Sequence, residues 1–544
     1  MTGHRTVLVI GGYGGFGARL ARRLAGDGWH VLVAGRSADK AQAFAATLPH
    51  AVGLAFDRTG DCAAQLAAIE ADLVIDAAGP FQHSDYRLPQ ACMARGLHYI
   101  DLADARDFVC GIGALDGGAR AAGVAVISGA SSVPALSGAV VRRLAAGMDR
   151  LVRIDSAISA TTRASAGPAV VRSALSYAGK PVRLWRGGEW TSAPGWSLGQ
   201  RLRFRLPGQP MLSRRVALAD VPDLELFPGL FPGQPATTFR GGSEFSLQMA
   251  ALGLLGWAVR LGWLRGAESL ARWLAPLQQV TAPLGGSRSA MQVEVAGFTG
   301  EQPLLRRWTL IARQGEGQEI PTMAAQLIAR QIAAGTLEPG ARHAGEALSL
   351  ADFEPLFAGI ACDHGADREE PALPYPRVMG EDFARLADPV RAMHLPLAES
   401  SAHGSATVER GKGLLARLLG LVMGFPPAGD YPVSVHFAPA KGRERWIRQF
   451  GPHRFSSEMS VSRAGLLIER FGPMRFHFAL EVDAAGGLVM HLRRWTAFGL
   501  PMPRALGPRI AASERAEGSS FIFDVAVAMP LLGQVVRYRG RLDQ

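Results

Sequence analysis

Short apolar runs and amphipathic stretches alternate along the first 130 residues of the chain. The apolar runs are Thr6–Ile10, His30–Ala34, Ala51–Phe56, Leu73–Ala77, His98–Asp101 and Val124–Ile127. The stretches between them, with helical spacing, are Phe16–Ala25, Asp39–Thr47, Cys62–Ile69, Tyr86–Arg95 and Phe108–Ala122. Alternating strands and helices indicate a doubly wound α/β domain, and near-continuous apolar runs are typical of parallel strands covered on both faces. We expect this domain to span residues 1–130.

The pattern is less regular over residues 131–370. Strand-like runs at Val152–Ala160, Met291–Phe298 and Arg307–Arg313 mix with helical stretches at Pro321–Ala333 and Ser349–Ala358. This mixture predicts a second α/β or α+β domain, which would bind substrate or form a dimer. Residues 181–242 are rich in Gly, Pro and Trp and are expected to be mostly loop.

The most apolar segment of the chain is Ser246–Val259. It is shorter than the roughly 20 apolar residues that a transmembrane helix needs, so none is expected. Two interpretations of residues 246–277 stay open. One is a packed helical hairpin or the interface of a homodimer. The other is amphipathic helices on a membrane surface, anchored by Trp257, Trp263 and Trp273.

The last third of the chain changes character after a Pro-rich, acidic segment, residues 371–386, that predicts a linker. Residues 387–544 carry short strand-like runs separated by turn residues, which indicate a mainly antiparallel β domain, either a sandwich or a barrel. Those runs are Pro432–Phe437, Arg445–Phe450, Leu466–Phe471, Phe476–Val482, Leu488–Trp495, Phe521–Val527 and Val535–Leu542. Phe-Gly-Pro-x-Arg-Phe occurs twice, at Phe450–Phe455 and Phe471–Phe476, as meander turns or by chance.

Composition narrows the class of protein. The chain has 544 residues, 48% of them apolar and 19% charged, as in globular proteins of several domains. Its 4 cysteines are scattered, so neither a metal site nor a disulfide framework is expected. The first apolar run is too short for a secretory signal, and a cytoplasmic protein is expected, with peripheral membrane contact left open. The net charge is +11, but the arginines form no dense cluster, so no nucleic-acid partner is expected.

A glycine-rich heptapeptide follows the first apolar run and opens the first helical stretch. Its glycines fit Gly12-x-Gly14-x-x-Gly17 or Gly11-x-x-Gly14-x-x-Gly17, and the second register is preferred because Gly11 directly follows Ile10. Glycines permit the tight turn and the approach of a pyrophosphate to the helix N-terminus. The motif predicts a Rossmann-type dinucleotide site formed by Gly11, Gly12, Tyr13, Gly14, Gly15, Phe16 and Gly17. A purely structural glycine turn is the alternative.

The end of the second strand indicates which dinucleotide binds. Ala34 and Gly35 stand where a site for NAD carries an acid, and Arg36 and Ser37 follow. A guanidinium and a hydroxyl bind a 2′-phosphate, which favours NADP over NAD. Asp57 follows the third strand, where it either meets the adenine edge or caps a turn. After the fourth strand, the wall of the cofactor crevice is expected at Ala78, Gly79, Pro80 and Phe81, with Ala78 and Gly79 as plain packing residues the alternative.

These motifs together resemble the saccharopine dehydrogenase-like oxidoreductases over about residues 5–360. The resemblance rests on the glycine motif, "GRS", "AAGPF", "ACMARGLHYIDL" and "ISGASSVPALSGAVV", with "EIPTMAAQLIARQIAAG" as the late helix of that family. From about Asp382 onward the chain resembles an uncharacterised bacterial domain. The resemblance implies NADP or NAD binding through Gly11, Gly14, Gly17, Arg36, Gly79, Pro80 and Phe81.

The same resemblance implies hydride transfer, classically at a carbon–nitrogen bond, with some relatives acting on lipid-linked substrates. The family commonly has an Asp followed four residues later by a Glu; here Asp101 is followed by Ala105, with Asp104 beside it. The candidates for the proton donor are Asp104 and His83, on loops after the fifth and fourth strands. Otherwise Asp104 is the N-cap of the next helix and His83 a polar loop residue, while His98 is expected to be structural.

We therefore expect an NADP-dependent oxidoreductase that acts on a small-molecule substrate. The segment 246–277 and the added β domain favour an apolar or lipid-like one. The alternative is a non-catalytic NADP(H)-binding redox sensor or scaffold, whose C-terminal domain binds lipid or a protein partner.

Overall fold

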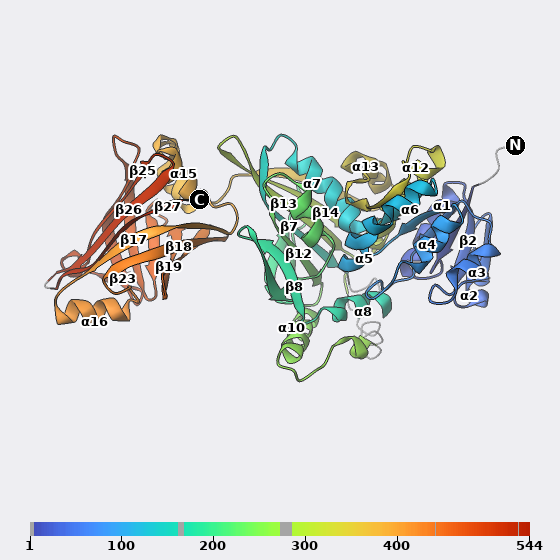
Figure 1. The fold of residues 1–544 in the computed structure, drawn as a ribbon, viewed down its shortest axis with the longest axis horizontal. Helices are drawn as coiled ribbons and strands as arrows, with labels where there is room; N and C mark the ends of the chain where they lie inside the picture. The colour runs from blue at the N-terminus through green and yellow to red at the C-terminus, as the bar shows by residue number, and fades with distance from the viewer. Residues whose placement is uncertain (1–4, 162–167, 272–284, 441, 531, 544) are drawn as a thin grey trace. The chain divides into compact units, whose positions relative to one another are not determined.

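The computed structural model describes residues 5–161, 168–271, 285–440, 442–530 and 532–543. The chain forms two compact units. The first comprises Met1–Trp185, Glu189–Gly300 and Leu305–Glu369, and the second comprises Arg186–Gly188, Glu301–Leu304 and Glu370–Gln544. Figure 1 follows the chain through both units from blue to red.

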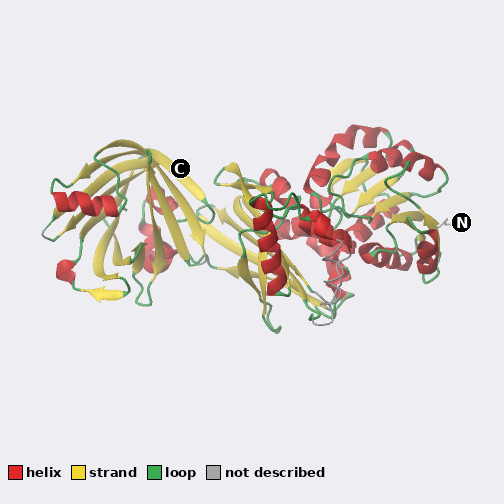
Figure 2. Cartoon of the chain, turned by 90° about the horizontal axis from the view of Figure 1, so that it is seen from below, coloured by secondary structure: helices red, strands yellow, loops and turns green. Residues whose placement is uncertain are grey.

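The first unit begins with a parallel sheet in the order β15-β6-β5-β4-β1-β2-β3. Its strands are β1 Thr6–Ile10, β2 His30–Gly35, β3 Ala51–Ala55, β4 Leu73–Asp76, β5 His98–Asp101, β6 Ala125–Ser128 and β15 Gly340–His343. Its helices are α1 Gly15–Gly26, α2 Ala38–Ala45, α3 Cys62–Ala67, α4 Arg87–Ala94, α5 Arg106–Gly111 and α6 Asp116–Ala121. Helices cover both faces of the sheet, as Figure 2 shows, which confirms the predicted doubly wound fold.

One predicted helix of this domain is broken. The stretch Phe108–Ala122 divides into α5, a 3-10 turn at Ile112–Leu115 and α6. Glycines at positions 111, 113, 117 and 118 explain the break, because each glycine lowers helix stability by up to about 1 kcal/mol.

The seventh strand, β15, was not predicted and comes from far along the chain. It pairs in parallel with β6, with Gly340 opposite Ala125. Before it, α12 Ile320–Ala334 packs on α1, where Arg23 pairs with Glu319 at 3.1 Å and Arg330 pairs with Asp27 at 2.7 Å. The first sheet therefore extends beyond the predicted boundary at residue 130.

The second sheet of the same unit is mixed, in the order β10-β11-β12-β7-β13-β14-β16. Its strands are β7 Arg150–Ala160, β10 Gln200–Phe204, β11 Leu212–Leu218, β12 Ala236–Ser243, β13 Ser289–Thr299, β14 Gln302–Ala312 and β16 Cys362–Glu369, and β8 Pro181–Arg186 pairs separately with β9 Glu189–Pro194. The helices of this region are α7 Ser137–Ala145, α8 Pro168–Ser176, α9 Asp223–Leu230, α10 Ser246–Arg260 and α13 Leu350–Ala358.

The expectation that residues 181–242 are mostly loop is wrong. Strands β8 to β12 and helix α9 lie in this stretch. Its Gly and Pro residues form the turns between short strands, for example Gly187 and Gly188, which both have positive φ, between β8 and β9. Frequent turn residues concealed the strands because no run between them is long and apolar.

Helix α10 contains the most apolar segment of the chain. Met249 and Gly256 are buried against the rest of the unit, whereas Leu247, Leu254 and Trp257 are exposed. The predicted segment 246–277 continues beyond α10, and its residues 272–277, which include Trp273, lie outside the described residues. In the described parts of the chain, every helix is too short or too polar to cross a bilayer.

The second unit is a closed antiparallel barrel, because β22 pairs with both β21 and β23 and completes a ring. Its strands are β17 Ser400–Arg410, β18 Gly429–Ala440, β19 Arg443–Phe450, β20 His453–Val461, β21 Leu467–Phe471, β22 Met474–Val482, β23 Leu488–Ala497, β24 Leu500–Met502, β25 Arg509–Glu517, β26 Ser520–Met529 and β27 Gly533–Asp543. Helix α16 Leu414–Val422 connects β17 and β18. The two Phe-Gly-Pro-x-Arg-Phe motifs contain the turns of the β19–β20 and β21–β22 hairpins.

The predicted linker 371–386 is instead part of this unit. It contains α14 Pro374–Met379 and a 3-10 helix at Gly380–Arg385, and α15 Asp388–Met393 follows. Leu373, Tyr375, Met379 and Phe383 are buried. Proline suits the first turn of a helix, so a Pro-rich composition here marks helix starts rather than an extended connection.

Candidate cofactor and active site

The glycine loop between β1 and α1 is shaped by backbone contacts that exclude side chains. Gly11 has φ +76° and donates its N–H to the Ala34 carbonyl at 2.8 Å, while Gly14 donates to the Gly11 carbonyl at 2.8 Å. A Cβ on Gly12 would lie 2.7 Å from the Val9 oxygen, and one on Gly17 would lie 2.1 Å from the Gly11 oxygen. These contacts require glycine and leave a cradle at the start of α1, which fits a pyrophosphate.

Tyr13 ties this loop to the end of β2. Its hydroxyl accepts the Ser37 N–H at 3.1 Å, and its ring lies over Gly35, where an added Cβ would approach within 2.5 Å. An acid at position 35, as in a site for NAD, would therefore displace the tyrosine ring. The sequence suggested that Gly35 reflects cofactor choice, and Tyr13 adds a packing reason that only the structure reveals.

The two predicted 2′-phosphate ligands differ in what is available for binding. Arg36 is exposed at the end of β2. The Ser37 hydroxyl caps α2 by accepting the Lys40 N–H at 3.4 Å, a long contact that a phosphate oxygen could replace. Asp57 accepts the Thr59 N–H at 3.0 Å and the Thr59 hydroxyl at 2.7 Å, and these bonds hold its pKa below the usual value. The Asp57 carboxylate thus shapes a turn beside Arg36.

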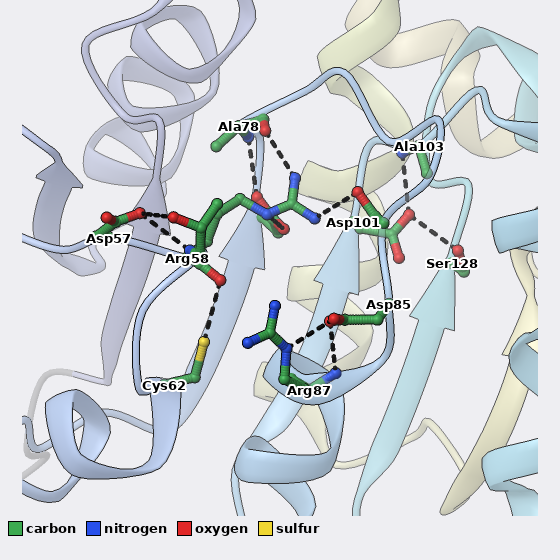
Figure 3. Close-up of polar contacts among 12 residues, drawn as sticks. Asp57, Arg58, Cys62, Ala78, Asp85, Arg87, Asp101, Ala103 and Ser128 are labelled. Carbon is green, nitrogen blue, oxygen red and sulfur yellow. Dashed lines mark hydrogen bonds and ion pairs between the residues drawn. The ribbon is translucent and has the colours of Figure 1, made fainter.

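The loop after β4, predicted as the cofactor wall, is held by an arginine that the sequence analysis did not single out. Arg58 donates to the Ala78 carbonyl at 2.7 Å and to the Ser84 hydroxyl at 3.1 Å, and it pairs with Asp76 at 3.3 Å. Figure 3 shows Arg58 reaching across from the loop after β3 to Ala78. Arg58 also lies 4.6 Å above the Phe81 ring. An arginine that links two loops separated in the sequence leaves no recognisable pattern there, so Arg58 was not predicted.

Buried carboxylates end the neighbouring strands β4 and β5. Asp76 accepts the Ala78 N–H at 2.9 Å, and Asp101 accepts the Ala103 N–H at 3.0 Å, the Gly129 N–H at 2.8 Å and the Ser128 hydroxyl at 3.0 Å. Burial raises the pKa of Asp101 to about 7 and also raises that of Asp76. These carboxylates hold the starts of the loops that border the carboxyl edge of the sheet, where Rossmann-type domains bind their ligands.

Asp104 lies where the first sheet meets the region of the second sheet, within the first unit. Ser173 of α8 donates its hydroxyl to Asp104 at 3.1 Å, and Gln82 bridges the pair by donating to Ser173 at 2.8 Å. Burial is the largest effect on Asp104 and raises its pKa, and burial also raises the pKa of the neighbouring Tyr177 well above its usual value. The N-cap interpretation of Asp104 is wrong, since α5 begins after Ala105 without a side-chain cap.

The other candidates and the surrounding charges are placed differently. His83 is exposed on the loop beside Gln82, with φ +66°. His98 accepts the Ala125 N–H at 3.0 Å, in keeping with a structural role. Arg106 is buried and paired with Asp220 at 3.1 Å and Glu225 at 2.6 Å. These pairs join α5 to the region of α9 within the first unit. The charge of Arg106 is therefore compensated within the protein.

The family comparisons agree with this arrangement of the chain. Residues 7–127 match the saccharopine dehydrogenase NADP binding domain, and residues 386–542 match a domain of unknown function (DUF4166). Residues 7–127, which carry strands β1 to β6, therefore match an NADP-binding domain of the saccharopine dehydrogenase type. This confirms the resemblance over residues 7–127 and 386–542 and the cofactor type predicted from the glycine loop and Arg36.

Individual relatives cover parts of the chain. Serine 3-dehydrogenase of Agrobacterium fabrum is 39% identical over 82 residues, which are 14% of this chain and 33% of that protein. This chain thus matches about a third of the length of that curated relative. The apo structure of saccharopine dehydrogenase (L-Glu forming) from Saccharomyces cerevisiae is similar over 67% of this chain and all of that one, with 15% identity and a TM-score of 0.48.

Proposed function

We propose that the first unit catalyses NADP-dependent hydride transfer and that Asp104 handles the proton of the reaction. The observation that carries this proposal is the position of Asp104. It is half-buried on the loop after β5, at the carboxyl edge of the NADP-binding sheet, and its pKa is raised by burial. A carboxyl group with a raised pKa keeps its proton to higher pH than an ordinary aspartate, and it can give that proton to a substrate heteroatom.

NADPH, when bound, supplies the hydride. The chain's own residues would position it: the glycine loop binds the pyrophosphate at the start of α1, Arg36 binds the 2′-phosphate, and the loop fixed by Arg58 borders the crevice. Gln82 and Ser173 orient the Asp104 carboxyl. In reduction, the substrate carbon gains the hydride while its nitrogen or oxygen takes the Asp104 proton; oxidation reverses both transfers.

The surroundings of Asp104 support an apolar or uncharged substrate. The described side-chain partners of Asp104, Gln82 and Ser173, are neutral, and the nearby Arg106 is already paired with two carboxylates. On the same loop, Ala103 and Ala105 pack with Phe81 and Phe108 in an apolar cluster. A dicarboxylate substrate would require uncompensated arginines instead.

The test compares Asp104→Asn with Asp107→Asn, an exposed aspartate on the following helix. Wild-type protein is titrated with NADPH and then assayed for NADPH oxidation with imines, ketones and enoyl compounds of increasing chain length. We expect Asp104→Asn to keep NADPH affinity but to lose activity by about 10²–10⁴-fold, and Asp107→Asn to match wild type. Full activity of Asp104→Asn would overturn the role of Asp104. NADPH binding without turnover of any compound would favour the redox sensor.

A further inference from the structure

Exposed apolar side chains of the barrel unit are confined to one end of the barrel. In the described part of this unit, the large apolar residues that are exposed are Leu414, Leu415, Leu418, Leu421, Phe498, Leu500 and Leu506. The first four lie on α16, and the other three lie on β24 and the connections around it. Leu414 and Phe498 are each 83% exposed. Isolated exposed leucines are ordinary, whereas a gathering of this kind marks a binding surface.

The strand pairings place both groups at the same end. The end of β17, from which α16 starts, pairs with the start of β18, with Val408 opposite Gly429. The end of β23, which leads to Phe498, pairs with the start of β22, with Ala497 opposite Met474. The strands from β18 to β22 alternate in direction. The start of β18, the end of β19, the start of β20, the end of β21 and the start of β22 therefore all lie at this end of the barrel. Figure 1 shows α16 at this end of the unit.

Helix α16 is fixed so that its leucines point outward. Leu414, Leu418 and Leu421 follow helical spacing along one side. The opposite side carries small residues: Ala416 is buried, and a Cβ on Gly420 would meet the Arg410 guanidinium. Arg410 in turn donates to the Arg417 and Phe425 carbonyls at 3.1 Å each, at the carboxyl-terminal part of the helix. The leucines cannot turn inward without loss of these contacts.

The connecting segments at this end carry charge of one sign. The segments that form it, residues 411–428, 451–454, 472–475 and 498–509, contain no Asp or Glu in the sequence. Exposed cations stand among the apolar residues: Lys412, Arg417, Arg475, Arg504 and Arg509. Two acids flank the segment 411–428 along the chain: Asp430 accepts the Thr407 hydroxyl at 2.6 Å, and Glu409 pairs with Arg539 at 3.4 Å. The opposite end of the barrel carries Glu481, Asp483, Glu517 and Asp543.

We propose that this apolar–basic end of the barrel docks on a lipid bilayer that contains anionic phospholipids. Leucines and a phenylalanine enter the interface between headgroups and acyl chains, and the surrounding Lys and Arg side chains bind lipid phosphates. The charge pattern selects this occupant. A second copy would bring two basic surfaces together, and a nucleic acid would leave the seven apolar side chains in water. The proposal concerns a surface of the second unit and does not depend on the proposed chemistry of the first.

The experiment is co-sedimentation of the full chain with vesicles of phosphatidylcholine, with and without phosphatidylglycerol, at low and high salt. The first variant replaces Leu414, Leu415, Leu418 and Leu421 by Gln, which keeps helix propensity. The second replaces Lys412 and Arg417 by Gln. The control replaces Leu247 and Leu254 by Gln on α10 of the first unit, where two leucines are similarly exposed. Circular dichroism and urea unfolding check that each variant is folded.

We expect wild type to bind vesicles with phosphatidylglycerol at least tenfold more tightly than pure phosphatidylcholine, and high salt to weaken binding. The leucine variant should lose at least tenfold in partitioning, the charge variant should show a smaller preference for anionic lipid, and the α10 control should bind as wild type. The proposal is overturned if wild type stays in solution with both vesicles, or if the folded leucine variant binds equally well. It is also overturned if wild type is a dimer that the leucine variant converts to a monomer, or if loss of binding occurs in the α10 control instead.

Discussion

The NADP-binding sheet and the barrel bury ionisable side chains in different ways. In the sheet, Asp76 and Asp101 stand at strand ends, and each binds backbone N–H groups of the loop that follows. In the barrel, the buried carboxylates of Glu444 and Glu514 lie within strands and bind side chains instead. Glu514 binds His394 at 2.6 Å, and Glu444 accepts the Trp446 indole N–H.

This difference separates two uses of a buried charge. A carboxylate at a strand end shapes the open edge of a sheet, so changes there should affect ligand binding. A carboxylate within a barrel wall fastens one part of the core to another; His394, at the end of α15, stacks on Tyr375 at 3.8 Å and on Trp446 at 5.5 Å. Changes there should affect stability and leave NADPH binding unchanged.

The largest effect is expected for His394→Leu. Loss of the imidazole leaves the buried Glu514 carboxylate without its partner, which should lower the free energy of unfolding of the barrel by about 3–5 kcal/mol. Urea unfolding measures it. The control is His491→Leu, which removes an exposed pair with Glu481 at 2.9 Å and should cost about 0.5 kcal/mol or less. If His394→Leu lowers the free energy of unfolding as little as the control does, the stabilising role of the His394–Glu514 pair is wrong.

Glu444→Gln should alter the dependence of barrel stability on pH. Burial raises the Glu444 pKa from 4.5 to about 7, so the folded state binds the proton more tightly than the unfolded state. The wild-type free energy of unfolding therefore loses the Glu444 contribution as pH rises from about 4.5 to 7, by up to about 3 kcal/mol. Glutamine still accepts the Trp446 N–H. Because glutamine does not titrate, the free energy of unfolding of the variant should lack this pH-dependent loss. Unfolding curves of variant and wild type that stay parallel across this range would refute the prediction; exposed Glu481→Gln is the matched control.

Gly17→Ala should act on binding in the sheet. A Cβ would lie 2.1 Å from the Gly11 carbonyl oxygen, so the glycine loop must move. We expect NADPH affinity to fall by about 100-fold or more, roughly 2.7 kcal/mol, as measured by fluorescence titration. Gly26→Ala, at the end of the same helix with open space around it, should bind as wild type. Equal affinities of the two variants would show that the loop tolerates the side chain.

Arg36→Asp should produce the smallest effect. Loss of the guanidinium and gain of a carboxylate should weaken NADPH binding by about tenfold or more, roughly 1.4 kcal/mol, while NADH binding should not weaken. The control is Arg95→Asp, an exposed arginine at the end of α4. NADPH affinity that stays within about threefold of wild type would refute the role of Arg36 at the 2′-phosphate.

The sequence predicted what depends on local pattern. Strands β1, β2 and β4 to β6 were found because they are largely buried and their apolar runs are continuous, whereas the edge strand β3 has no buried residue and was found from its short apolar run alone. The glycine loop was found because backbone geometry demands glycine there. Within the barrel, Leu467–Phe471 and Leu488–Ala497 were found almost to the residue, whereas β17 Ser400–Arg410, with small and polar residues on its two faces, was missed.

The features that escaped prediction depend on contacts between distant segments. Ser173 reaches Asp104 from 69 positions away, and Arg58 reaches Ala78 from 20 positions away. Tyr13 could be placed in the loop, but its contact with Gly35 requires the loop and β2 to be assembled. Strand β15 contains Gly, Ala, Arg and His, and it is a strand only because β6 offers it an edge.

The late arrival of β15 has a consequence for synthesis of the protein. The ribosome completes β6 at Ser128 but must add the whole second sheet up to β14 before Gly340 emerges. At about 5–20 residues per second, the edge of β6 waits on the order of 10–40 s for its partner. During this time an unpaired, apolar strand edge is open to other chains. Expression at lower temperature or with chaperones should therefore favour soluble protein, and a nucleotide-binding fragment cut at residue 130 should aggregate.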